Sequence, residues 1–276
     1  MRAKEFIPST LLILSLLVAC NSETTFSTES IPTDTILPAT HTPTHTPAKT
    51  STVTPTEEPE EWTYVVLGDS TSWGFPDFYA KYIESDLGVN VTVLNRSRSD
   101  LSSGRLLEMI REDQELRSEI ENATVISYTA NPTDHIGLRL SSGYGKHDCS
   151  DEALEGYKAD LEEIVSEIFA LRQGSPTIIR AMDLYCPTYG RWEKREDGMF
   201  DEYRRCFDAV NDVIRQVAEE NNIPLANVYD VFNGINHDED PVEKGYILSD
   251  GEHTNRTGSQ VIADVFRELG YEFITP

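Results

Sequence analysis

A serine stands where a short apolar run gives way to a turn and then to a helical pattern. Residues 62–67 are mostly β-branched or aromatic and end at Gly68, which predicts a buried parallel strand. Apolar side chains recur at helical spacing over residues 75–87. Ser70 thus follows the carboxyl end of a strand, where open parallel sheets bind ligands. Its hydroxyl is a candidate nucleophile, although Gly-Asp-Ser alone is also an ordinary turn sequence.

A second candidate group lies just before the last predicted helix. A histidine that acts as a base needs an acceptor on its far ring nitrogen, usually a carboxylate, which fixes the tautomer and stabilises the imidazolium. Asp250 precedes His253 by three residues, and Gly251 loosens the backbone between them. We expect the carboxylate of Asp250 to orient His253, and His253 to act as the base for Ser70.

A third candidate, Asn131, follows the central predicted strand. Ester hydrolysis passes through a tetrahedral oxyanion, and the site must hold donors ready where that charge develops. The Asn131 amide and the backbone N–H of Ser70 can supply two of them. A turn asparagine before Pro132 is the structural alternative, because such pairs are common in loops.

The elements that must position these residues alternate between strand and helix. Further strand candidates are residues 89–94, 124–128, 177–182 and 225–231. Helical apolar stripes occupy residues 154–171, 207–217 and 261–269. This alternation predicts an α/β fold in which right-handed crossovers build a parallel sheet with helices on both faces. We expect this domain to span residues 61–276.

The first 60 residues predict export and attachment. Residues 1–19 have a charged start and an apolar core too short to cross a membrane, as in a signal peptide. The sequence Leu-Val-Ala-Cys ending at Cys20 resembles the lipobox of bacterial lipoproteins, although an ordinary signal peptide with a chance cysteine is an alternative. Residues 20–60 are rich in Thr, Ser and Pro and predict a disordered tether. We expect an extracytoplasmic protein anchored to a lipid bilayer through Cys20.

The charge balance limits the partners. The chain has 23 basic and 48 acidic residues, which gives a formal net charge of −25 at pH 7. Such a charge argues against nucleic-acid backbones and anionic lipid headgroups as binding partners. It does not identify a substrate, because much surface charge serves solubility.

Three cysteines follow Cys20 in a chain whose leader predicts a disulfide-permissive compartment. They are Cys149, Cys186 and Cys206. We expect a bridge between Cys186 and Cys206, because it would tie down the loop of aromatic and charged residues between them. The spacing alone leaves the pairing open.

Together these blocks resemble the SGNH, or GDSL, hydrolase superfamily over about residues 62 to 273. The resemblance implies a flavodoxin-like three-layer α/β/α sandwich with a parallel five-stranded sheet. It also implies hydrolysis of carboxylic esters through an acyl-enzyme, with no metal or cofactor. Carried onto this chain, it makes Ser70 the nucleophile, His253 the base, Asp250 its orienting carboxylate and Asn131 an oxyanion donor.

Two blocks depart from the family pattern. The second block usually has an Asn followed by a Gly whose N–H joins the oxyanion hole, whereas here Asn95 is followed by Asp100 at the Gly position. Asp can adopt the left-handed backbone of a Gly, so we expect the Asp100 N–H to be a donor, with Gly104 as the alternative. The third block usually reads Gly-any-Asn-Asp, whereas this chain has Thr-Ala-Asn-Pro around Asn131.

Aromatic and basic side chains alternate after the strand candidate at residues 177–182. This mixture suits stacking on sugar rings, so an O-acetylated glycan of the cell envelope is an expected substrate, beside other small-molecule esters. The alternative is an insertion that packs its rings on the edge of the fold. The residues are Tyr185, Tyr189, Arg191, Trp192, Lys194, Arg195, Phe200, Tyr203 and Arg204.

Two other classes of function are alternatives. The altered second and third blocks fit a catalytically weak or inactive carbohydrate-binding or envelope protein of the same fold. A metal-dependent phosphoesterase is the other alternative, but two-metal sites take ligands from separate strand ends, and the acidic run after His237 is typical of a solvated loop. Its ligands would be Asp69, Asn131, Asp250 and His253, with His237, Asp238, Glu239 and Asp240.

Overall fold

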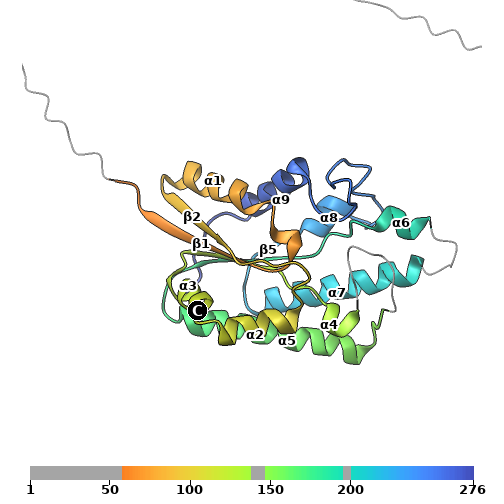
Figure 1. Ribbon diagram of the computed structural model, residues 1–276, viewed down its shortest axis with the longest axis horizontal. Coiled ribbons are helices and arrows are strands. Elements are labelled where there is room, and N and C mark those ends of the chain that lie inside the picture. Colours follow the sequence, from red (N-terminus) through yellow and green to blue (C-terminus); the bar gives the residue numbers. More distant parts are fainter. Residues whose placement is uncertain (1–57, 138–146, 195–199) are drawn as a thin grey trace, which may run out of the picture. The chain divides into compact units, whose positions relative to one another are not determined.

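A computed structural model describes residues 58–137, 147–194 and 200–276 of the chain (Figure 1). The expected signal peptide, Cys20 and nearly all of the expected tether lie outside the described residues. Within the described ranges, no helix has both the length and the apolar character needed to cross a membrane.

The centre of the fold is a five-stranded parallel sheet, as predicted, and its strand order is β2-β1-β3-β4-β5. In register, Val66 of β1 lies beside Asn95 of β2 and Ser127 of β3. The carboxyl ends of these three strands are therefore level, and the segments that follow them meet at one edge of the sheet. The strands are β1 (Glu61–Leu67), β2 (Asn90–Asn95), β3 (Val125–Tyr128), β4 (Ile178–Met182) and β5 (Leu225–Ala226).

The predicted strand over residues 225–231 is wrong beyond Ala226, where helix α8 (Val228–Asn233) takes over. The side chain of Asn227 caps this helix by accepting a hydrogen bond from the backbone N–H of Asp230. Val228 and Phe232, four residues apart, are both buried, so the apolar run has helical spacing as well as strand character.

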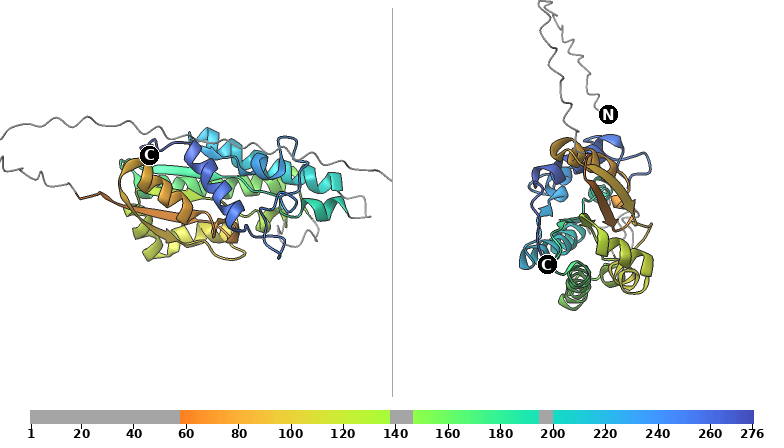
Figure 2. Two further views of the ribbon diagram at one scale, coloured as in Figure 1. Left: turned by 90° about the horizontal axis from the view of Figure 1, so that it is seen from above. Right: turned by 90° about the vertical axis from the view of Figure 1, so that its left-hand side faces the viewer.

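Helices cover both faces of the sheet, which confirms the three-layer α/β/α arrangement (Figures 1 and 2). In Figure 1, α1, α8 and α9 lie above the sheet, and α2, α3, α5 and α7 lie below it. The upper layer buries Tyr79 and Phe266 against Tyr64 and Val66 of β1. The remaining bounds are α1 (Pro76–Leu87), α2 (Ser103–Glu112), α3 (Gln114–Asn122), α4 (Thr133–Ile136), α5 (Asp151–Arg172), α6 (Tyr189–Glu193), α7 (Phe200–Glu220) and α9 (Arg256–Glu268).

The disulfide joins Cys149 to Cys206, so the expected Cys186–Cys206 pairing is wrong. Cys149 precedes α5 and Cys206 lies on α7, and these two neighbouring helices bring the Cα atoms to 5.5 Å. Cys186 remains a buried free thiol, and its backbone N–H donates to Oδ1 of Asn233 at 2.8 Å. The helix packing therefore selects the partner of Cys206, which spacing alone could not do.

Candidate active site

The turn that carries Ser70 is built from its neighbours. Gly68 has φ of 149°, and a Cβ there would lie 2.7 Å from Cγ2 of Thr129, so the chain needs glycine at this point. Asp69 caps a single 3₁₀ turn, η1 (Ser70–Ser72), by accepting a hydrogen bond from the Thr71 N–H at 2.9 Å. Ser70 thus begins this turn, with only Gly68 and Asp69 between it and the end of β1.

Three of the predicted residues form one hydrogen-bonded array. Oγ of Ser70 lies 2.9 Å from Nε2 of His253, and Nδ1 of His253 lies 3.0 Å from Oδ2 of Asp250. The two ring nitrogens of His253 therefore face a hydroxyl and a carboxylate. This arrangement can accept the proton of an attacking hydroxyl and hold the resulting imidazolium.

The turn before α9 holds the carboxylate of this array. Oδ1 of Asp250 accepts backbone hydrogen bonds from Glu252 at 2.9 Å and from His253 at 3.1 Å, and Gly251 takes a left-handed φ of 76°. Partial burial acts to raise the pKa of Asp250, but the hydrogen bonds from Glu252 and His253 outweigh it and leave that pKa below its ordinary value. Asp250 is thereby kept ionised beside His253.

Two residues predicted to bind sugar instead support this turn. Nη2 of Arg191 donates to the backbone carbonyl of Asp250 at 3.0 Å, and the Tyr185 hydroxyl donates to the carbonyl of Glu252 at 3.2 Å. The pattern of alternating rings and cations did not reveal this role, because it depends on where β4 and α6 bring the side chains.

The expected aromatic platform is not formed by these rings. Tyr185, Tyr189 and Tyr203 are buried, and Tyr189 packs edge to face against Phe200. The alternative interpretation, an insertion that packs its rings into the fold, fits these three tyrosines. Arg195 and the side chain of Trp192 lie outside the described residues.

Asn131 lies next to the nucleophile turn. Its Nδ2 donates to Oδ2 of Asp69 at 2.7 Å, and its Oδ1 accepts the Thr133 N–H at 3.0 Å. The amide oxygen is therefore turned toward α4 and the NH₂ group toward the nucleophile turn. An amide nitrogen has two N–H donors, so one stays available after the bond to Asp69.

The loop after β2 closes the same region. The Arg98 N–H donates to the Gly68 carbonyl at 3.0 Å, and the Ser103 N–H donates to the Asn131 carbonyl at 2.8 Å. Asp100 lies between these contacts with φ of 53°, the left-handed backbone expected for it. Gly104 packs against acidic groups instead, since a Cβ there would lie 3.0 Å from Oδ2 of Asp134. Those surroundings disfavour an oxyanion beside Gly104.

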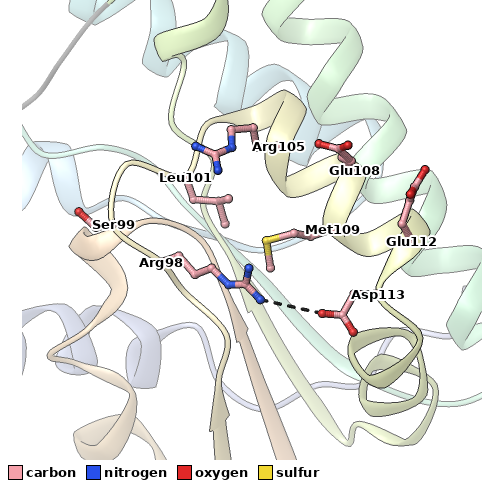
Figure 3. Close-up of a pocket in the computed structure, with 8 residues that line it drawn as sticks. All are labelled: Arg98, Ser99, Leu101, Arg105, Glu108, Met109, Glu112 and Asp113. Atoms are coloured by element: carbon pink, nitrogen blue, oxygen red, sulfur yellow. Dashed lines mark ion pairs between the residues drawn. The ribbon is translucent and has the colours of Figure 1, made fainter.

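A pocket of about 480 Å³ lies on the α2 side of this loop (Figure 3). Arg98 and Asp113 form an ion pair across it at 3.9 Å. Neither Ser70 nor His253 is among the residues that line it, so the pocket adjoins the loop after β2 and not Ser70. Its lining residues are Arg98, Ser99, Leu101, Arg105, Glu108, Met109, Glu112 and Asp113.

Sequence reasoning missed one neighbour of the array. The ring of Trp73 stacks on the ring of His253, with centroids 5.5 Å apart and planes inclined by 2°. Trp73 follows η1 directly and is half exposed. Its position three residues after Ser70, at the end of a tight turn, could have indicated that the indole lies near the serine hydroxyl.

The model of one protein family, GDSL-like lipase/acylhydrolase, matches residues 64–266. This segment holds Ser70, Asn131, Asp250 and His253. The chain belongs to this family. It is therefore a carboxylic ester hydrolase of the GDSL type.

The similar proteins align with this GDSL hydrolase over nearly all of their own length. The spore germination lipase LipC of Bacillus licheniformis is 23% identical over 231 residues, which make up 75% of this chain and 96% of that protein. The structure of a lipase, Lip_vut3, from a goat rumen metagenome superposes with a TM-score of 0.60 at 20% identity, over 76% of this chain and 98% of that one. A lipase/acylhydrolase from Enterococcus faecalis gives 0.51 at 16% identity, over 78% and 98%.

The ligands expected for a metal-dependent phosphoesterase bond to other side chains instead. His237 bonds to Asp208 and Asp230 through its two ring nitrogens, each at 2.8 Å. Asp250 bonds to His253, and His253 faces Ser70. Within the described ranges, no group of three or more His, Cys, Asp or Glu side chains is arranged to hold a metal ion.

Proposed function

We propose that this hydrolase cleaves esters through an acyl-enzyme on Ser70. Oγ of Ser70 attacks the ester carbonyl carbon while its proton passes to Nε2 of His253. The imidazolium then gives that proton to the leaving alcohol as the C–O bond breaks. Water, deprotonated by His253, releases the acid and restores the hydroxyl. The observation that carries this proposal is the 2.9 Å contact between Ser70 and His253.

Asp250 would hold the tautomer of His253 that has its proton on Nδ1. The backbone carbonyl of Asp250 accepts a hydrogen bond from Arg191, which stabilises the turn that carries the carboxylate. Because this carboxylate acts through the ring, its loss should cost less than the loss of Ser70 or His253.

The oxyanion would be held by three donors around the nucleophile turn. They are the backbone N–H groups of Ser70 and Asp100 and the remaining N–H of Asn131. Turns, loops and caps in the described part of the chain form many backbone hydrogen bonds. None of these bonds has the N–H of Ser70 or Asp100 as its donor. An Asp in place of the usual Gly adds a negative side chain near this hole, which opposes the developing anion.

Substitution of the two reacting groups tests this mechanism. We expect Ser70→Ala and His253→Ala each to lower kcat for p-nitrophenyl acetate by several orders of magnitude, and Ser70→Ala to abolish labelling by a fluorophosphonate probe. Leu87→Ala, an exposed change on α1, is the matched control and should keep the wild-type rate. Wild-type turnover by Ser70→Ala would overturn the mechanism.

We further propose that the substrate is a short acyl ester, such as an O-acetyl group on an envelope glycan, and that Cys20 carries a lipid anchor. The predicted export leader supports an envelope glycan, since it would place the enzyme beside such esters. The Leu-Val-Ala-Cys sequence supports the anchor.

Two assays separate these finer proposals. A series of p-nitrophenyl esters from acetate to palmitate, with acetate release from O-acetylated oligosaccharides, reports the acyl and alcohol parts. Preference for long acyl chains would argue against the glycan ester. Metabolic labelling with a palmitate analogue, compared between the wild type and Cys20→Ser, reports the anchor, and equal labelling of both would refute it.

A further inference from the structure

We infer that Trp73 is a positioning residue that holds the ring of His253 and stabilises its charged form. The inference rests on the proposed function, since it gives Trp73 a part in the proton transfer from Ser70. The near-parallel stack on His253 carries it.

Trp73 and Ser70 belong to one rigid turn. The Trp73 N–H donates to the Ser70 carbonyl at 3.3 Å, closing η1. Asp69 caps the same turn with hydrogen bonds to the N–H and hydroxyl of Thr71. The distance between the indole and the nucleophile is therefore set by a few backbone dihedrals together with χ1 and χ2 of Trp73, and the stack places His253 relative to Ser70.

His253 needs a restraint that its hydrogen bonds do not supply. Both bonds, to Ser70 and to Asp250, run in the plane of the imidazole, so the ring can still rock out of that plane. Its carboxylate partner is exposed, with 46% of the Asp250 side chain accessible against 27% for His253. A parallel indole face opposes this rocking, because tilting the ring breaks the stacking contact.

The stack also lowers the activation free energy of the proton transfer. His253 becomes a cation only while it holds the proton of Ser70, and the face of a tryptophan attracts cations more strongly than any other ring. The cation–π attraction therefore appears in the transition state and is weaker with the neutral ring of the resting enzyme. Loss of the indole should lower kcat and leave KM unchanged, since only interactions specific to the transition state act on kcat.

The experiment compares Trp73→Phe, Trp73→Leu and Leu87→Ala in the full chain. Phe keeps a π face, Leu keeps apolar bulk without one, and Leu87→Ala reports a loss of exposed apolar surface away from the site. The readouts are kcat and KM for p-nitrophenyl acetate, the rate of Ser70 phosphonylation by a fluorophosphonate, and Tm.

We expect Trp73→Leu to lower kcat and the phosphonylation rate about fivefold with unchanged KM, while Trp73→Phe retains most of both rates. Equal rates for Trp73→Leu and the wild type, or a raised KM at unchanged kcat, would overturn the inference. The second result would make Trp73 a substrate contact. Ser70→Ala is measured in parallel, because turnover by that variant would refute the proposed function itself, independently of Trp73.

Discussion

A buried carboxyl group beside the sheet should make the stability of this protein depend on pH. Asp183 directly follows β4 and is fully buried. Its Oδ1 accepts the Tyr229 N–H at 2.9 Å. Its Oδ2 has no hydrogen-bond partner among the described residues and lies 3.6 Å from Nη2 of Arg215, which is an ion-pair distance. Burial raises the pKa of Asp183 from 3.8 to about 7, and it outweighs the Tyr229 N–H and Arg215, which lower it.

The sign of the effect follows from where the proton is held more tightly. The folded protein keeps Asp183 protonated up to about pH 7, whereas the unfolded chain releases the proton near pH 3.8. The contribution of Asp183 to the free energy of unfolding is therefore fully present below about pH 4 and is lost as the pH rises through 7. The whole loss amounts to roughly 4 kcal/mol, of which about 3 kcal/mol falls between pH 5 and pH 8.

Asp183→Asn removes the titration and keeps the acceptor for the Tyr229 N–H. We expect the stability of the variant relative to the wild type to rise by about 3 kcal/mol between pH 5 and pH 8. Urea unfolding of both proteins at each pH, with the disulfide intact, measures this difference. Asp77→Asn, at an exposed position of α1, controls for the loss of a charge. A relative stability of Asp183→Asn that is the same at both pH values would refute the argument.

Two further predictions concern the active-site turn and the disulfide. Arg191→Ala removes the donor to the Asp250 carbonyl and should lower kcat about tenfold at unchanged substrate range, whereas Lys194→Ala, a charge change nearby, should not. Cys206→Ser removes the Cys149–Cys206 bridge, which joins residues 57 positions apart and restricts the unfolded chain. Its loss should lower the free energy of unfolding by about 4 kcal/mol, measured by urea unfolding. Little change in stability for Cys206→Ser would contradict the entropic argument.

Much of the fold could be read from local patterns. The first four strands and the helices over residues 75–87, 154–171, 207–217 and 261–269 were predicted because each has a periodicity that matches one secondary structure. The parallel direction of the strands follows from the helical connections between them, but their order was not predicted. The strand over residues 225–231 could not be predicted correctly, because Val228 and Phe232 fit a strand and a helix equally well until the Asn227 cap is seen.

The sequence by itself determined the candidate reacting groups of this protein. Ser70 and Asn131 follow the ends of two parallel strands, which brings them to one edge of the sheet, and Asp250 and His253 share one short turn before the last helix. The left-handed backbone at Asp100 was also predictable, because it depends on local sterics.

Only the tertiary structure decided what surrounds these groups. The partner of Cys206, the burial of Tyr185 and Tyr189, the bond from Arg191 to Asp250 and the stack of Trp73 on His253 all join segments far apart in the chain. Their contacts depend on how helices pack and on the direction each side chain takes. Periodicity reports which face of an element is buried, but it does not say which side chain from another element meets that face.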